Sequence, residues 1–369
     1  MIDTIVITLN PSQYQITNPD KFTPSASLLA VPEQGVQVRQ NPTAKELLMG
    51  IYKPKLTLTR RLNPAKQPTI TLRIELSLPK LLFNNNFNEL QYKDFARLIN
   101  KLVTVLAEMG VSTSAAILAV APVSAIHYAK NFPLTDGATP YYFINKLKSA
   151  NIQMTLDVNQ TDYRNDGHAY RWHCNAYEVV FYDKLADLEK ARVSAKRAVE
   201  KDNTIQLNLF EQLKKRTKLE FLRMEVRLNQ RAKMRTLFKK LKISAPLTFK
   251  RLFKPAIAKR VLLHYIDQVE SKRPSLLDYS LNNHRALLAD LIFNNPKLSP
   301  KQIFQVLGFR AALAELNPRE LRAHFPHYHQ RSWYRLMAEM QRVQLAPRVH
   351  SFATIRKQLV QFKPVKLAI

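Results

Sequence analysis

Tyr182 stands where the stretch AYEVVFYDKLADLEK, residues 176–190, changes from strand-like to helix-like spacing. In an extended chain the alternate positions Glu178, Tyr182 and Lys184 fall along one side, so a carboxylate, a phenol and an ammonium are neighbours. A phenol, with a pKa of about 10, becomes a nucleophile at neutral pH when a cation stabilises its phenolate. Lys184 or a bound metal ion would do so, and attack on a DNA phosphodiester would leave a covalent phosphotyrosine and a free 3′-hydroxyl.

The same tyrosine has an ordinary structural interpretation. A tyrosine at the end of a strand is usually a packing residue whose hydroxyl lies at the rim of the core. The chain has 14 tyrosines, so spacing alone leaves both interpretations of Tyr182 open.

A second pattern with chemical potential is KLEFLRMEVRLN, residues 218–229, which alternates strictly between polar and apolar positions after Phe221. It predicts a strand with Arg223, Glu225 and Arg227 on one face. A carboxylate between two arginines is typical of an ion-pair cluster on the protein surface. A metal-binding or proton-transfer role for Glu225 is the alternative, and the predicted catalytic residues are Tyr182, Lys184 and Glu225.

Histidines offer candidate ligands for Mg²⁺ or Mn²⁺ at three positions, His127, His168 and His173. His168 and His173 are five residues apart and would point to opposite faces of a continuous strand, so they do not form a tight metal-binding pair. The predicted metal ligands are His127, Glu178 and Glu225.

The net charge of +29 is unevenly distributed and predicts a polyanionic partner, nucleic acid before an anionic membrane or the ribosome. Residues 201–260 alone carry 18 basic and four acidic side chains. We expect this segment to follow a DNA backbone. Its predicted DNA-binding residues are Lys214, Lys215, Arg216, Arg223, Arg227, Arg231, Lys233, Arg235, Lys239 and Lys240.

Several classes of protein are disfavoured. The chain lacks a GxxxxGK[ST] phosphate-binding loop, a Cys-x-x-Cys pair and a GxSxG nucleophile motif. Its single cysteine, Cys174, permits no internal disulfide, which fits a reducing compartment. The first residues do not have the pattern of a signal peptide, and the apolar run 115–126 is too short to span a bilayer. The sequence therefore predicts a cytoplasmic protein without a membrane partner.

Hydrophobic periodicity predicts an α+β protein in two parts. The first 80 residues alternate as strands, and residues 90–110 and 139–150 have helical spacing. Residues 115–132 suggest one or two strands, and strands are expected at 151–158 and 169–182, followed by a basic helix over about 184–200. From about 245 onward only helical patterns remain. We expect a mainly antiparallel α+β domain at 1–245, an all-helical domain at 246–369, and a linker at 244–255.

Six segments, in order, resemble the replication initiation proteins of filamentous phages and plasmids, the gene II/gene X family. They are MIDTIVITL, ELSLPKLLFNNNFNEL, VSAIHYAKNF, YEVVFYDKLADLEK, LEFLRMEVRL and LGFRAALAEL followed by RSWYRLMAEM. In this resemblance Tyr182 matches the nicking tyrosine, Lys184 shares its tyrosine-x-lysine pattern, and Glu225 matches a strand glutamate. His127 departs from the acidic residue of the phage relatives, and an imidazole suits Mg²⁺ less well than an oxygen ligand does.

The resemblance implies a site-specific, metal-dependent single-strand endonuclease that starts rolling-circle replication. Such an enzyme would nick double-stranded origin DNA, hold the 5′ end, and rejoin the displaced single strand after one round. The resemblance also implies that the domain at 1–245 is the nicking domain and that the protein acts in the cytoplasm of a bacterial host cell. The implied partners are the host replication helicase and polymerase.

A non-catalytic origin or operator binder is the rival hypothesis. LSPKQIFQVLGFRAALAEL, residues 298–316, followed by RSWYRLM, residues 331–337, fits a helix-turn-helix whose second helix enters the major groove. In that case Tyr182 only packs, and the basic charge only positions the protein on DNA.

Overall fold

The computed structural model describes residues 1–30, 37–62, 67–134, 139–149, 160–164, 168–187, 220–271, 284–316, 318–344 and 351–366. Three predictions lie outside these ranges: the strand at 151–158, most of the basic helix after residue 187, and the DNA contacts of Lys214, Lys215 and Arg216. Helices and strands both contribute to the fold, and all the described elements after residue 228 are helices, so the predicted fold class is confirmed.

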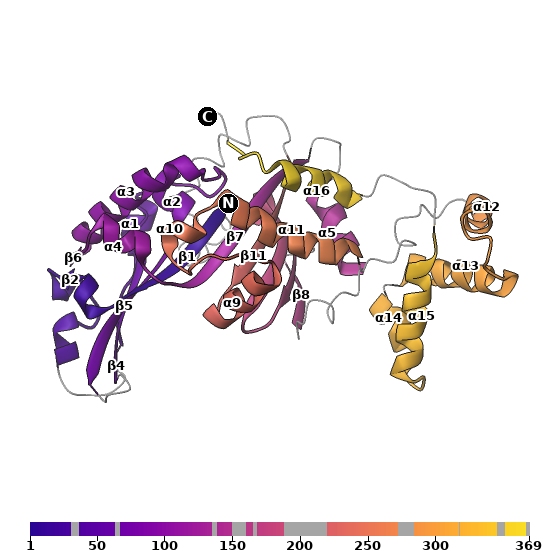
Figure 1. The fold of residues 1–369 in the computed structure, drawn as a ribbon, viewed down its shortest axis with the longest axis horizontal. Coiled ribbons are helices and arrows are strands. Elements are labelled where there is room, and N and C mark those ends of the chain that lie inside the picture. The colour runs from indigo at the N-terminus through magenta and orange to yellow at the C-terminus, as the bar shows by residue number, and fades with distance from the viewer. Residues whose placement is uncertain are drawn as a thin grey trace.

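Nine of the described strands form one antiparallel sheet in the order β3-β4-β5-β1-β7-β11-β10-β9-β8 (Figure 1). A small second sheet pairs β2 (Gln15–Ile16) with β6 (Val111–Ser112). The strands of the large sheet are β1 Ile2–Leu9, β3 Gln37–Gln40, β4 Lys55–Leu62, β5 Pro68–Ser77, β7 Val123–Leu134, β8 Gln160–Arg164, β9 Ala169–His173, β10 Tyr177–Asp183 and β11 Glu220–Leu228.

The large sheet has an apolar face and a polar face. In β5, Ile74 and Leu76 are buried, whereas Arg73 beside them in the chain is exposed, as its alternating sequence predicts. Residues paired across neighbouring strands share a face. Ile5 of β1 pairs with both Leu76 and Ile126, so the apolar side continues through β1 into β7.

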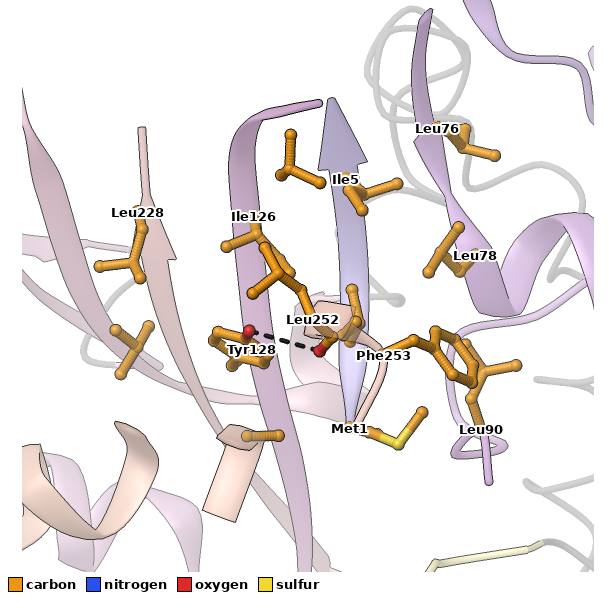
Figure 2. Close-up of a cluster of buried hydrophobic side chains, with 14 of the residues drawn as sticks. Met1, Ile5, Leu76, Leu78, Leu90, Ile126, Tyr128, Leu228, Leu252 and Phe253 are labelled. Carbon is orange, nitrogen blue, oxygen red and sulfur yellow. Dashed lines mark hydrogen bonds between the residues drawn. The ribbon is translucent and has the colours of Figure 1, made fainter. Parts of the chain in front are cut away.

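Helices cover the apolar face and complete a single buried cluster. Figure 2 shows side chains of several strands meeting Leu252 and Phe253 there, and the hydroxyl of Tyr128 donates a hydrogen bond to the Leu252 carbonyl at 3.5 Å. In the described residues outside 284–342 the α-helices are α1 Ala44–Leu48, α2 Leu78–Phe83, α3 Phe95–Glu108, α4 Ala115–Val120, α5 Pro140–Ser149, α9 Arg231–Lys240, α10 Phe249–Leu252, α11 Pro255–Ser271 and α16 Ser351–Gln361.

The predicted boundary between residues 245 and 246 is wrong. Phe249, Leu252 and Phe253, inside the predicted linker, are fully buried in the cluster of the sheet. The helices α11 and α16 also belong to that cluster. The sheet domain therefore includes helices from the predicted C-terminal domain.

The remaining described α-helices form a second unit (Figure 1), and their buried side chains make a separate apolar core. They are α12 His284–Asn294, α13 Pro300–Glu315, α14 Pro318–Ala323 and α15 Gln330–Arg342. Because α11 and α16 both pack in the sheet domain, this helical module, residues 284–343, is an insertion between them.

Residues 115–120, expected as a strand, form the helix α4, whose N-cap Ser114 accepts a hydrogen bond from the Ile117 amide. The helix predicted over 90–110 is confirmed as α3, and Gly110 follows it with a φ of 79°, a left-handed conformation that glycine adopts without strain. None of the helices in the described ranges combines the length and apolarity needed to cross a lipid bilayer.

Candidate functional site

Tyr182 and Glu225 are joined by a hydrogen bond on the polar face of the sheet. Tyr182 on β10 pairs in register with Arg223 on β11, and Glu225 is two residues further along β11, opposite Val180. The Tyr182 hydroxyl reaches diagonally and donates to Glu225 Oε1 at 2.7 Å. Sequence spacing placed these two residues on separate strands without indicating that they meet.

Glu225 is also the acceptor for two guanidinium groups. Arg223 Nε donates to Oε1 at 2.7 Å, and Arg227 donates to Oε2 from Nε at 2.9 Å. Although burial alone would raise it, Arg227, Arg223 and the Tyr182 hydroxyl hold the pKa of Glu225 well below its usual value. Glu225 is therefore an ionised carboxylate. Burial raises the pKa of Tyr182 well above that of a free phenol. The shared proton therefore stays on the Tyr182 hydroxyl.

Tyr182, Arg223 and Glu225 form a buried cluster, so the prediction of an ion-pair cluster on the protein surface is wrong. Arg223 and Glu225 are 2% and 3% exposed, and Tyr182 is 9% exposed. Arg223 also bonds to Asp3 Oδ1 at 2.6 Å, which the sequence did not indicate. Because the guanidinium of Arg223 is enclosed by protein groups, its predicted role as a direct DNA contact is wrong.

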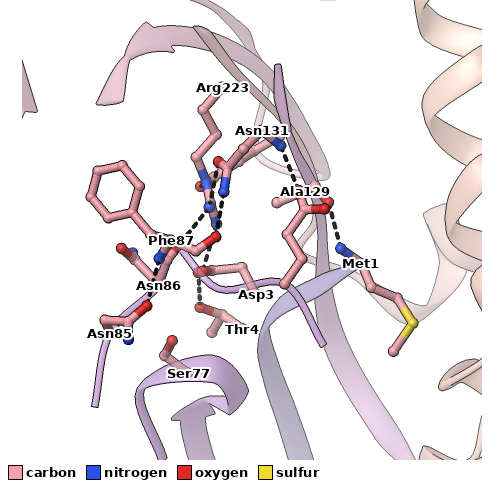
Figure 3. A network of polar contacts seen from close by, with 12 residues as sticks. Met1, Asp3, Thr4, Ser77, Asn85, Asn86, Phe87, Ala129, Asn131 and Arg223 are labelled. Atoms are coloured by element: carbon pink, nitrogen blue, oxygen red, sulfur yellow. Dashed lines mark hydrogen bonds and ion pairs between the residues drawn. The ribbon is translucent and has the colours of Figure 1, made fainter. Parts of the chain in front are cut away.

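The loop 84–90 covers the cluster at this end of the sheet. Arg223 Nη1 donates to the carbonyl of Asn86 at 2.8 Å, and Asn131 Nδ2 donates to the carbonyl of Phe87 at 2.8 Å. Figure 3 shows these groups converging around Arg223 and Asp3. The ring of Phe87 meets Phe221 edge to face, with centroids 5.9 Å apart. The NNNFNE stretch, residues 84–89, thus closes the site.

Lys184 lies over the aromatic ring of Tyr182. It follows β10 in a helical turn, and its Nζ lies 5.7 Å from the centre of the Tyr182 ring and 5.4 Å from that of Phe87. Burial, reinforced by the positive charge of Arg223, lowers the pKa of Lys184 to about 7. The predicted alignment of Lys184 with the strand positions is therefore replaced by a cation over the faces of two aromatic rings.

The predicted metal ligands do not form a metal site. Arg227 pairs in register with both His127 and Glu178, so its cation lies between the two candidate ligands. Glu225 already accepts from Tyr182, Arg223 and Arg227. Within the described ranges no group of three His, Cys, Asp or Glu side chains is arranged to hold a metal ion. These residues do not fit Mg²⁺ or Mn²⁺.

From Arg227 a chain of ion pairs continues across the sheet and becomes partly exposed. Arg227 and Arg171 both approach Glu178 Oε2 at 3.4 Å, and Arg171 also contacts Asp162 on β8. His173 Nε2 lies 3.0 Å from the same Asp162 oxygen. The side chain of Arg227 is 30% exposed and that of Arg171 is 22% exposed. Sequence reasoning missed Arg171 and Asp162, although each lies in a short alternating strand.

The predicted DNA-binding residues of α9 lie on the other side of the sheet. Met234, Leu237 and Phe238 of α9 pack in the cluster on the apolar face, and Lys233 Nζ lies 3.8 Å from the centre of the Tyr177 ring. The outward cations of α9 line a cleft of about 540 Å³ against residues 243–247: Arg231, Arg235 and Lys239. Lys240 is exposed as well. The α9 cations and Tyr182 therefore lie on opposite sides of the sheet.

Comparisons of the chain with protein-family models, with curated proteins and with solved structures give no match. The resemblance to replication initiators accordingly stays an expectation that depends on the motifs themselves.

Proposed function

We propose that this protein is a DNA nicking and joining enzyme that initiates rolling-circle replication of a phage or plasmid, with Tyr182 as its nucleophile. The observation that carries the proposal is the 2.7 Å hydrogen bond from the Tyr182 hydroxyl to the ionised carboxylate of Glu225, which two arginines flank. A phenol beside a carboxylate base and two guanidinium groups has the components needed for transfer of a phosphodiester to tyrosine.

In the proposed reaction the proton passes from the Tyr182 hydroxyl to Glu225 as the phenolic oxygen bonds to phosphorus. The bond from phosphorus to the 3′-oxygen breaks, and that oxygen leaves with a proton returned by the Glu225 carboxylic acid. The products are a 5′-phosphotyrosine and a 3′-hydroxyl, and the same steps in reverse rejoin the strand. Arg227, which is partly exposed, would bind the phosphate.

Access to the nucleophile requires movement of the loop 84–90. Tyr182 is only 9% exposed, and Phe87 lies over the neighbouring side chains. Asn86 and Phe87 of the loop are bonded to Arg223 and Asn131 through neutral backbone carbonyls. Glu89 anchors the end of the loop through a buried ion pair with Lys130 at 2.6 Å, so the movement concerns the residues before Glu89. The proposal therefore includes an opening step in which a DNA strand takes the place of this loop.

The polar face of the sheet supplies a surface for the strand beyond the cluster. Arg73 is 46% exposed in its side chain, and it pairs in register with Thr57 and Thr8, so hydroxyl groups share its face. The net charge of +29 favours any such contact with phosphates. The proposed partners are double-stranded origin DNA, the displaced single strand, and the host replication helicase and polymerase.

The test is incubation of the full chain with supercoiled plasmid carrying the chain's own replicon, in buffers with Mg²⁺, with Mn²⁺ and with neither. We expect open circles and a protein-DNA adduct that survives detergent, with mass spectrometry placing the nucleotide on Tyr182. Tyr182→Phe should abolish both products. Tyr128→Phe is the matched control, because Tyr128 is also a buried strand tyrosine and lies on the opposite face.

Nicking that persists in Tyr182→Phe would exclude Tyr182 as the nucleophile. Retarded but uncut plasmid in every buffer would favour the non-catalytic origin binder. The requirement for Mg²⁺ or Mn²⁺ stays a prediction, which the three buffers examine directly.

A further inference from the structure

The helical module at 284–343 is built around Trp333. Trp333 is 5% exposed and belongs to the second core, where its ring lies 6.2 Å from that of Phe309 of α13, measured between centroids. Arg322 of α14 lies over the same indole ring at 5.7 Å. Because α13 and α14 both pack against this residue of α15, the three helices hold one another in a fixed arrangement.

The helix α15 divides into a buried side and an exposed side. Trp333, Met337 and Met340 are buried at the spacing of one helical face. The opposite side begins with Gln330 and Arg331 and continues through the exposed residues Tyr334, Arg335, Ala338 and Arg342. These side chains of α15 are therefore exposed, among the residues that the structure describes, and can contact a partner.

The charge and size of this side fit one kind of partner. It carries three arginines, and its one acidic residue, Glu339, makes only a loose contact with Arg335 at 4.0 Å. The whole module has nine Lys and Arg against four Asp and Glu. A helix of 13 residues is about 20 Å long. A single α-helix fits the major groove of B-DNA, which is about 12 Å wide.

The element preceding α15 completes the arrangement. The short helix α14 ends at Ala323, and the turn 324–329 that follows it is exposed throughout. In helix-turn-helix proteins the first helix crosses the DNA backbone and the second enters the major groove. The sequence paired residues 298–316 directly with 331–337, whereas the structure places α14 between them, so α14 and α15 form the candidate pair.

We propose that α14 and α15 are a helix-turn-helix that reads double-stranded DNA, with α15 in the major groove and Arg331 and Arg335 at the base edges. The pair is remote in sequence from Tyr182 and packs in a separate core. This inference therefore goes beyond the nicking activity and stands or falls independently of it.

The experiment begins with selection of duplexes from a sequence-randomised pool of about 30 base pairs, using the full chain as the binder. The wild type should enrich a defined motif. The selected duplex is then remade with 7-deazaguanine, which removes the N7 acceptor that arginine binds in the major groove. We expect the wild type to bind the remade duplex about tenfold more weakly, because arginine can no longer bind guanine through two hydrogen bonds.

The variant Arg331→Ala/Arg335→Ala should bind the unmodified duplex about tenfold or more weakly and should no longer distinguish it from the 7-deazaguanine duplex. Arg97→Ala/Lys101→Ala removes two exposed cations at the same four-residue spacing on α3 and should leave binding within about twofold.

Absence of an enriched motif would overturn the proposal. So would equal losses of affinity in the α3 and α15 variants, or a preference of the wild type for the single strand of the same sequence. If the wild type recognises the selected duplex but does not nick the plasmid, the proposed nicking by Tyr182 is contradicted and the proposal for α14 and α15 is supported.

Discussion

Tyr182 and Glu225 meet diagonally across β10 and β11, with their side chains 2.7 Å apart at the closest oxygen atoms. Arg223, the direct cross-strand partner of Tyr182, binds the same Glu225 oxygen at 2.7 Å. The three side chains therefore form one unit in which the carboxylate is balanced by a guanidinium and bonded to a phenol. Changes to any member affect the charge balance of a site from which water is largely excluded.

Replacing Arg223 by methionine should lower the free energy of unfolding by about 3–5 kcal/mol, because Asp3 and Glu225 would lose the cation that compensates them in the interior. Urea unfolding of the full chain measures the change. Arg73→Met is the matched control, because Arg73 also pairs with a glutamate two residues further along its strand but is 46% exposed. That control should cost less than about 1 kcal/mol, and equal decreases would contradict the assignment of a compensating role to Arg223.

Lys184 gives a dependence of stability on pH. Its pKa is about 7 in the folded protein, against 10.5 for a free lysine, so between these values the unfolded chain binds more protons. Stability from this group should therefore rise as pH increases from about 7 toward 10.5. Between pH 6 and pH 9 the wild type should gain about 3 kcal/mol relative to Lys184→Met in urea unfolding. Lys101→Met, at an exposed position, should run parallel to the wild type, and a parallel Lys184→Met curve would refute the prediction.

The helix α16 should be indispensable to the sheet domain although it follows the inserted module. Phe352 is 1% exposed and contacts Phe143 of α5, with ring centroids 5.5 Å apart. Phe352→Ala should lower the free energy of unfolding by about 3–5 kcal/mol through loss of burial and formation of a cavity. Phe304→Ala, on the exposed side of α13 at 66% exposure, should change it by less than about 0.5 kcal/mol. Denaturant unfolding of both variants makes the comparison.

The cations of α9 should act through charge alone. Removal of Arg231, Arg235 and Lys239 together should reduce the slope of log affinity against log salt by up to about 0.9 for each phosphate that the protein no longer neutralises. Anisotropy titrations with one mixed-sequence duplex at several salt concentrations measure the slope. An unchanged slope would exclude α9 from the interface. The comparable triple variant of Lys93, Arg97 and Lys101 serves as the control and should leave the slope as it is.

The sequence predicted the strands of the sheet where polar and apolar residues alternate. In β5 and β11 the alternation identified the apolar face correctly. The strand predicted at residues 115–120 is wrong because a short apolar run has no periodicity that separates a strand from a helix. The N-cap Ser114 stabilises the helix there. The division into domains failed because helical spacing shows an apolar face but not which surface covers it.

The site was only partly predictable. The sequence identified Tyr182 and Glu225 separately, each from its own strand, but their meeting depends on the register of β10 against β11. The burial of Arg223 depends on Asp3 and on the loop 84–90, both more than 130 residues away in the chain. Contacts of this range leave no trace in local spacing, so a polar strand face was taken for a solvated one.

The position of the helical module between α11 and α16 restricts where a bound duplex can go. The chain connects the module to the sheet domain at both ends. A C-terminal domain would have a single connection and could rotate about it. The six residues at 345–350 limit the separation of Gln344 and Ser351 to about 25 Å, even when fully extended. DNA bound by α15 would therefore be held within a limited distance of the sheet that carries Tyr182.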